Sequence, residues 1–157
     1  MDVPAVTALL EACYPVLFAL GYERDVLAPA LPRMTKANPR LLASGNFFVA
    51  ESADGGIVGC GGWSQERPGT NDIVEGEGHI RHFATHPDWL RRGIGRAIID
   101  HCVGQATAAG VKRFDCYSSL VAVAFYRAAG FSTVGAMTLD LGPGVTIPGV
   151  LMRREIG

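Results

Sequence analysis

Three arginines and two glycines lie close together in the segment RRGIGR, at the start of an apolar helical pattern. Gly93 and Gly95 carry no side chain, so they leave backbone N–H groups exposed where the chain turns into the helix. The first turn of a helix has unpaired N–H donors and a partial positive charge. Arg91, Arg92 and Arg96 add fixed charge around it. The segment therefore predicts an anion site, and a pyrophosphate fits it better than a carboxylate.

Two common nucleotide motifs do not account for this site. A dinucleotide fingerprint, G-x-G-x-x-G, would need a glycine at the position of Ile98, and the chain lacks a second set of alternating strands and helices. Asp115 follows at a suitable distance for a ribose contact, but it falls within an expected strand. No G-x-x-x-x-G-K-[ST] loop occurs either.

Periodicity places these residues on a series of strands and helices. A hairpin is expected from Phe47–Glu51 and Ile57–Ser64, joined by ADGG. Further along, we expect strands at His79–Thr85, Val111–Tyr117, Ser132–Leu141 and Val150–Glu155, a helix at Ile94–Ala109, and a helix capped by Ser118 or Ser119 that runs to Ala129. The strand–helix–strand order in the middle predicts two parallel strands with a right-handed crossover.

The first 42 residues predict helices instead of strands. Apolar residues recur at helical spacing up to Leu17, with Pro15 expected to kink or split the helix and Gly21 to end it. Prolines at 29, 32 and 39 predict short helices with breaks. The polar segment Glu66–Gly78 predicts a long, functional loop.

Composition limits the class of protein. The 157 residues fit one domain, 1–157, and the net charge of −1 gives no general attraction to nucleic acid or an anionic membrane. The strongest apolar run, Val16–Leu20, is far too short to span a bilayer. Four scattered cysteines without a C-x-x-C pair favour reduced, buried thiols and a cytoplasmic protein.

Two segments in this order carry a family resemblance. HIRHFATHPDWLRRGIGRAI, followed by a strand and SSLVAVAFYRAAGF, resembles the GNAT superfamily of acyl-CoA-dependent N-acetyltransferases. The family signature [QR]-x-x-G-x-[GA] is met from Arg92 to Ala97. In the more common register the glycines are Gly93 and Gly95, and Leu90 departs at the first position.

The resemblance implies a fold of the α/β (α+β) class. It would be a mixed, mostly antiparallel sheet with a central pair of parallel strands that splay apart, flanked by helices. This sequence opens with a helix where the family usually has a first strand, which leaves open a truncated start or a real variant. The thioester of acetyl-CoA, the implied co-substrate, would be threaded into the gap between the splayed strands.

The resemblance also implies a set of coenzyme-binding residues. The pyrophosphate would be wrapped by Arg91, Arg92, Gly93, Ile94, Gly95 and Arg96. The pantetheine arm would pair with the backbone of Phe83, Ala84 and Thr85 like an added strand. Ser119 stands where the family often has an asparagine at the head of the next helix.

Four residues are candidates for catalysis. Tyr126 matches the tyrosine of the family's Y-x-x-x-G-F segment, near the thioester sulfur. His79 stands where many members carry a glutamate that acts as general base, and an imidazole with a pKa near 6.5 could relay an amine proton. Glu77 and Glu75 are rival bases.

The arrangement of the histidines does not predict a metal site. Alternation along the strand would place its side chains on two opposite faces. One face would carry His79, Arg81, Phe83 and Thr85, and the other would carry Ile80, His82 and Ala84. His82 is then expected to be structural, and no metal site is expected because His79 and His82 face apart.

Taken together, these features predict an enzyme that transfers the acetyl group of acetyl-CoA to a primary amine by direct attack in a ternary complex. The acceptor, a small molecule or a peptide, is left open, as is a homodimer; neither nucleic acid nor a membrane is an expected partner. The alternative is a catalytically silent acyl-CoA-binding sensor or interaction module. Asp72, Glu75 and Glu77 could attract a cationic amine, but an acidic loop is usually only solvated.

Overall fold

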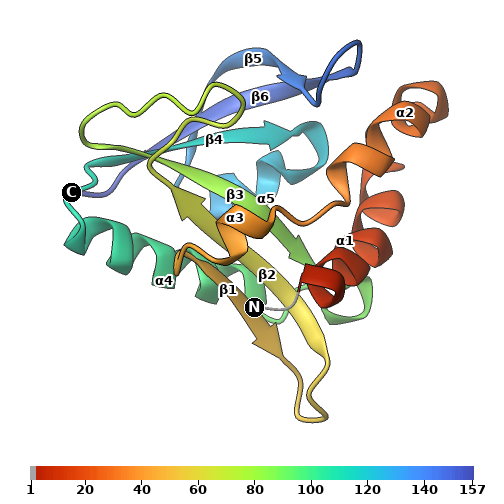
Figure 1. Ribbon diagram of the computed structural model, residues 1–157, viewed down its shortest axis with the longest axis horizontal. Helices are drawn as coiled ribbons and strands as arrows, with labels where there is room; N and C mark the ends of the chain where they lie inside the picture. The colour runs from red at the N-terminus through yellow and green to blue at the C-terminus, as the bar shows by residue number, and fades with distance from the viewer. Residues whose placement is uncertain (1–2) are drawn as a thin grey trace.

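The computed structural model describes residues 3–157, which form a mixed sheet with helices on both faces (Figure 1). The helices are α1 (Val3–Phe18), α2 (Arg24–Met34), α3 (Pro39–Leu42), α4 (Ile94–Ala108) and α5 (Val123–Ala128), with short 3-10 turns η1 (Pro87–Trp89) and η2 (Leu120–Ala122). The strands are β1 (Phe47–Glu51), β2 (Ile57–Ser64), β3 (Glu77–Thr85), β4 (Arg113–Ser119), β5 (Ser132–Asp140) and β6 (Thr146–Glu155).

The six strands lie in the order β1-β2-β3-β4-β6-β5. All neighbouring pairs are antiparallel except β3 and β4, which are parallel and joined by α4. This arrangement confirms the expected fold class. The predicted β1–β2 hairpin is also confirmed with the expected boundaries.

Two apolar clusters hold the layers together, one on each face of the sheet. Helices α1 to α3 pack over Cys60 and Ala84 on one face. Helices α4 and α5 pack over Trp63 and Ile80 on the other, as the ribbon shows. All four cysteines are free and buried, as expected for reduced thiols.

Strands β3 and β4 share only a short paired segment. Their register joins Glu77 to Arg113 and ends where His79 pairs with Asp115. Beyond His79 the two strands part, so one edge of β3 has no strand partner among the described residues. This is the predicted splay, and it opens the centre of the sheet.

A bulge in β3 overturns the expected alternation of its side chains. Arg81 pairs with Gly62 and Ala84 with Cys60, so β3 has one more residue than β2 between the two pairs. His82 lies in this interval with a left-handed φ of 53°. A bulge of this kind shifts the later residues to the opposite face.

The consequence is that His79 and Phe83 do not share a face. Phe83 packs closely over Gly61 on the α4 side, at 2.7 Å from where a Cβ would stand. Ala84 instead joins the cluster under α1, opposite to Ile80. Alternation fails here because it holds only while both strands contribute equal numbers of residues.

Several helix boundaries also differ from the sequence expectations. Pro15 does not split α1, and Pro29 and Pro32 lie inside a continuous α2. Burial of three α2 side chains offsets the lost hydrogen bonds: Leu27, Ala30 and Met34. Pro39, in contrast, begins α3 after Asn38, whose side chain caps the turn.

The expected serine-capped helix is replaced by two shorter pieces. The turn η2 precedes α5, and within residues 3–157 the side chain of Ser119 makes no capping hydrogen bond.

The predicted loop Glu66–Gly78 ends earlier than expected, because Glu77 already belongs to β3. Within residues 3–157, no helix is long and apolar enough to cross a bilayer.

Candidate active site

A cavity of about 400 Å³ occupies the gap between the parting strands. From β3 it is lined by Ile80 and the segment 82–85, and from β4 by the segment 116–119. Its other walls come from both faces of the sheet: Tyr14, Leu17, Phe18, Arg33 and Met34 from the α1–α2 side, and Leu90, Gly95, Ala122, Phe125 and Tyr126 from the α4–α5 side. The cavity therefore connects the two faces through the sheet.

The start of α4 has the exposed backbone donors that the sequence predicted. Gly93 is the N-cap residue with a left-handed φ of 77°, and no side chain caps the helix. The first turn also lacks an acidic residue. Gly95 borders the cavity and allows the ring of Phe125 to lie 2.7 Å from the position of a Cβ. The free N–H groups and the helix dipole suit an anion here.

The three arginines of this segment are not equivalent. The Arg92 guanidinium lies over the Trp89 ring, 4.7 Å from its centroid. Arg96 turns along the helix instead, with Nε 3.2 Å from Oδ1 of Asp100 and Nη1 donating to the carbonyl of Ala128 at 2.9 Å. Arg91 has a left-handed φ of 62° and an exposed side chain. Arg91 and Arg92 are thus free to meet an anion, whereas Arg96 joins α4 to α5.

The segment that the resemblance assigns to pantetheine pairing borders the cavity. Phe83, Ala84 and Thr85 all line the cavity on the unpaired edge of β3. The carbonyl of Phe83 accepts a hydrogen bond of 3.1 Å from the hydroxyl of Tyr14. Ser119 also lines the cavity, and no hydrogen bond of its hydroxyl is found within the described part of the chain.

Tyr126 is buried at the cavity wall. Its ring lies among those of Phe83, Phe125 and Phe131. Burial, together with the Cys116 thiol beside it, raises the pKa of Tyr126 well above its usual value. The hydroxyl therefore stays protonated at neutral pH and can only donate or accept a hydrogen bond.

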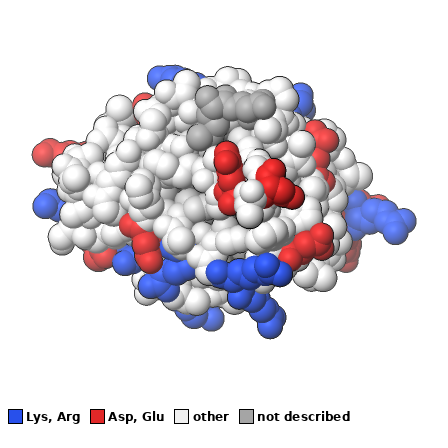
Figure 2. Space-filling model, turned by 90° about the horizontal axis from the view of Figure 1, so that it is seen from below, with Lys and Arg blue, Asp and Glu red and all other residues white. Residues whose placement is uncertain are grey.

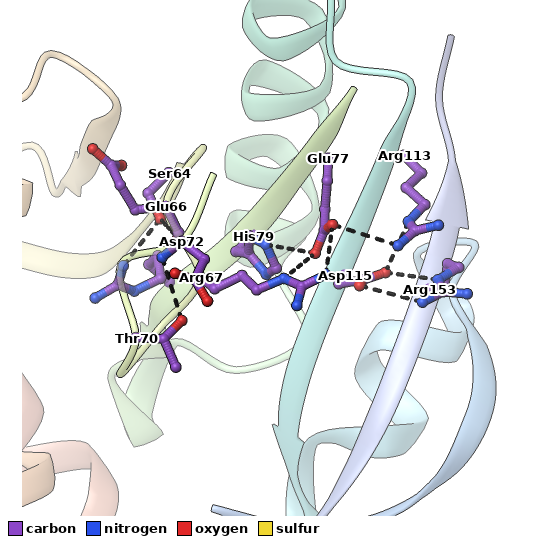
Figure 3. A network of polar contacts seen from close by, with 11 residues as sticks. Ser64, Glu66, Arg67, Thr70, Asp72, Glu77, His79, Arg113, Asp115 and Arg153 are labelled. Carbon is purple, nitrogen blue, oxygen red and sulfur yellow. Dashed lines mark hydrogen bonds and ion pairs between the residues drawn. The ribbon is translucent and has the colours of Figure 1, made fainter. Parts of the chain in front are cut away.

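His79 and Glu77 belong to an ionic network at the paired end of the parallel strands (Figure 3). Arg67, from the loop after β2, donates to both oxygens of Glu77 at 3.0 and 3.1 Å. Arg113 lies 3.5 Å from the same carboxylate. Nε2 of His79 is 3.0 Å from Oε1 of Glu77, without the alignment of a hydrogen bond.

The other half of this network lies on β4 and β6. The guanidinium of Arg153 donates to Asp115, with Nε 2.7 Å from Oδ1. Nε of Arg113 is 3.5 Å from the same oxygen. The three arginines therefore balance two buried carboxylates across three neighbouring strands.

The network sets the protonation of its central groups. The hydrogen bond from Arg67 is the main reason why the pKa of Glu77 is lowered. Burial is the main reason why the pKa of His79 is lowered, although the two carboxylates act in the opposite direction. At neutral pH Glu77 is charged and His79 is neutral.

The structure does not bring His79 and Glu77 to the cavity that holds Tyr126. His79 is 1% exposed, and its ring meets that of Tyr117 edge-on, with centroids 5.8 Å apart. Tyr117 does line the cavity. The histidine is thus one side chain away from the site.

Some cavity residues were not singled out by sequence reasoning. Tyr14 and Tyr117 fit apolar helix and strand patterns, and Arg33 is one of many surface arginines. His82 was expected to be structural, yet it borders the cavity at the bulge. Its left-handed φ could not be predicted, because positive φ is uncommon for any residue other than glycine and a single histidine within a strand pattern does not indicate it.

Charge on the surface is local. In the face drawn in Figure 2, Lys and Arg are grouped most densely along the lower edge, with others at the top and sides, and some Asp and Glu lie near the middle. Neither Asp72 nor Glu75 lines the cavity; both are exposed in the loop. Among residues 3–157, no group of histidine, cysteine and acidic side chains could hold a metal ion.

Similar folds occur in several solved acetyltransferase structures. A GCN5-related N-acetyltransferase from Rhodopseudomonas palustris superimposes with a TM-score of 0.72 at 20% identity, covering 98% of this chain and 89% of that one. The PaiA N-acetyltransferase from Thermoplasma acidophilum, solved with coenzyme A, gives 0.68 at 12% identity, with 98% and 92% covered.

A third structure aligns with part of a larger protein. N-acetylglutamate synthase from Neisseria gonorrhoeae, complexed with coenzyme A and N-acetyl-glutamate, gives a TM-score of 0.61 at 19% identity, over 99% of this chain but 33% of that one. A search of curated protein sequences found no match. Residues 43–133, more than half of the chain, match the acetyltransferase (GNAT) domain family. The chain therefore belongs to the GNAT family of acetyl-CoA-dependent N-acetyltransferases.

Proposed function

We propose that this acetyltransferase moves the acetyl group of acetyl-CoA directly to a primary amine while both substrates are bound. The observation that carries the proposal is the cavity between β3 and β4, which connects the two faces of the sheet beside the buried Tyr126. One substrate can enter from each face and meet the other in the middle. Such positioning replaces a bimolecular encounter by a step within one complex.

In this proposal coenzyme A enters from the α4–α5 face. Its pyrophosphate meets the free N–H groups of Gly93, Ile94 and Gly95, with Arg91 and Arg92 beside them. Its pantetheine arm then follows the unpaired edge of β3 along the segment 83–85. Two similarly folded proteins, from T. acidophilum and N. gonorrhoeae, were solved with coenzyme A.

The chemistry is attack of the neutral amine nitrogen on the thioester carbonyl carbon. A C–N bond forms, the C–S bond breaks, and the sulfur leaves as a thiolate that takes up a proton. A backbone N–H near Ala84, at the unpaired edge of β3, stabilises the oxyanion that forms in between.

Tyr126 assists the departing sulfur as a hydrogen-bond donor. At reference values, moving a proton from a phenol to a thiolate costs about 2 kcal/mol. The raised pKa of Tyr126 increases that cost. The hydroxyl therefore stabilises the thiolate, and the thiolate takes its proton from the surroundings.

Acceptance of the proton that the amine loses is the least direct step of the proposed reaction. We assign its acceptance to His79, through Tyr117 or a water, because the neutral imidazole contacts a ring that lines the cavity. Glu77 is a weaker candidate, since Arg67 and Arg113 stabilise its charged form. An amine that arrives already deprotonated needs neither residue.

The test is an acceptor screen that follows release of the coenzyme A thiol. A panel of primary amines is offered at saturating acetyl-CoA, and acetyl-CoA alone measures the background hydrolysis. Amine-dependent thiol release with a stoichiometric N-acetyl product is the expected result. Tight binding of acetyl-CoA without transfer to any amine would instead favour the alternative, a silent acyl-CoA-binding module.

A further inference from the structure

Within the described part of the chain, the walls of the cavity on the α1–α2 face are apolar and contain no carboxylate. Leu17, Phe18 and Met34 come from α1 and α2, and Leu139, Leu141 and Ile147 come from the β5–β6 hairpin. Among residues 3–157, no Asp or Glu lines any part of the cavity. A substrate with several positive charges would lose its hydration here and gain no opposite charge, which is costly.

Among residues 3–157, the single permanently charged side chain that lines the cavity is positive. Arg33, in the last turn of α2, is an exposed residue that lines the cavity. Its Nη1 donates to the carbonyl of Leu141 at 3.4 Å, and a Cβ at Gly142 would collide with the same nitrogen. The guanidinium therefore lies against the turn between β5 and β6, across the mouth of the cavity from α2.

Most of the hydrogen-bonding capacity of Arg33 is unused. A guanidinium has five N–H donors in a planar fork that matches a carboxylate. Within residues 3–157, Arg33 has no ion pair, and its contact with Leu141 is its only hydrogen bond. The remaining donors are available to an anionic group at the mouth.

From these observations we infer the class of acceptor, an inference that rests on the proposed acetyl transfer. The acceptor is a primary amine on an apolar body that carries one anionic group at its far end. The amine reaches the thioester beside Tyr126, the body fills the apolar walls, and Arg33 binds the anion at the mouth. Polyamines and other polycationic acceptors are excluded by the same walls.

A set of three amines separates these features. Phenethylamine supplies the apolar body alone, 4-(2-aminoethyl)benzoate adds a carboxylate at the far end, and spermidine is a polycation. We expect the benzoate to have the lowest KM and spermidine to be the poorest acceptor. Arg33→Leu should raise the KM for the benzoate about tenfold more than the KM for phenethylamine, as expected for loss of one charge-assisted contact.

Matched variants show that the effect belongs to this position. Arg24→Ala, which removes an exposed arginine from the first turn of the same helix, should not change the preference. Arg33→Lys keeps the charge without the planar fork and should restore part of the preference. The Kd for coenzyme A should be the same in all of these proteins.

Calorimetric titration of the same three amines, with and without coenzyme A, makes the result independent of turnover. Tighter binding of the benzoate that is lost in Arg33→Leu supports the inference, even if no amine is acetylated and the proposed transfer fails. Equal use of the benzoate and phenethylamine, a preference for spermidine, or no effect of Arg33→Leu would each overturn it while leaving acetyl transfer intact.

Discussion

Tyr126 is buried at the cavity wall. Its ring lies among three other aromatic rings, and the Cys116 thiol is beside its hydroxyl. Tyr126→Phe keeps the ring and removes only the oxygen. If the hydroxyl stabilises the leaving thiolate, kcat should fall about 10²-fold while the Kd for coenzyme A changes little.

A second tyrosine provides the matched control for this prediction. The Tyr22 hydroxyl donates to the carbonyl of Pro148 at 2.6 Å and accepts from the N–H of Leu120 at 2.9 Å, and Tyr22 itself does not line the cavity. Tyr22→Phe should lower the free energy of unfolding by about 1–2 kcal/mol and leave kcat nearly unchanged. A kcat for Tyr126→Phe equal to that of the wild type would reduce Tyr126 to a packing residue.

The pH dependence of the rate identifies the proton acceptor. Because burial lowers the pKa of His79, the rate at saturating acetyl-CoA should fall on the acid side only below about pH 6.5. His79→Ala should remove this acidic limb. His79→Gln should not restore it, since an amide cannot accept the proton.

A general base at Glu77 would give a different dependence of the rate on pH. Its pKa is lowered from an ordinary carboxyl value, so a limb that depends on Glu77 would lie below about pH 4.5. A limb that survives His79→Ala and vanishes in Glu77→Gln would assign the base to the carboxylate. A limb that survives both changes would mean that the amine arrives already deprotonated.

At the scale of elements, the start of α4 combines a backbone anion site with two free arginines. Replacing Arg91 and Arg92 together by alanine should weaken coenzyme A binding tenfold or more and reduce its dependence on salt. Pantetheine, which lacks the phosphates, should bind the variant and the wild type almost equally. Calorimetry with both ligands checks this, and equal losses would show that the arginines do not contact phosphate.

Arg96 offers a comparison within the same element. Because its guanidinium already contacts Asp100 and the carbonyl of Ala128, Arg96→Ala should affect coenzyme A binding less than the double variant does. Its main effect should be on the packing of α4 against α5. An effect on affinity as large as that of the double variant would contradict this assignment.

At the scale of the whole molecule, the buried His79 and the half-buried His82 make the fold sensitive to acid. His82, at the bulge, has a pKa lowered to about 4, chiefly by burial, and the pKa of His79 is lowered as well. Unfolded imidazoles bind protons near pH 6.5, where the folded ones do not. The unfolded state therefore gains protons first, and stability falls as the pH falls through this range.

Urea denaturation at pH 7 and pH 5 measures this effect. Asparagine tolerates the left-handed backbone of position 82, so His82→Asn removes the titrating group and keeps the bulge. Between pH 7 and pH 5 the variant should lose roughly 2 kcal/mol less stability than the wild type. Equal losses in both proteins would show that His82 is protonated as easily in the folded state as in the unfolded chain.

Local sequence by itself determined most of the order of elements. The β1–β2 hairpin, the strand–helix–strand unit around α4 and the glycine-rich helix start were all predictable, because periodicity and glycine chemistry act over a few residues. The parallel pairing of β3 and β4 followed from that order, since a crossover helix joins parallel strands. Cavity residues with a motif, such as Tyr126 and Gly95, could also be named in advance.

Tertiary structure alone decided how these residues face one another. The bulge at His82 depends on pairing with β2, twenty residues earlier in the chain, and it separates His79 from Phe83. The charges that act on His79 come partly from Arg67 in a loop and from Asp115 on β4. Arg33 reaches the cavity only because α2 packs beside the β5–β6 turn. Such contacts join residues far apart in the sequence, and no local pattern of side chains encodes them.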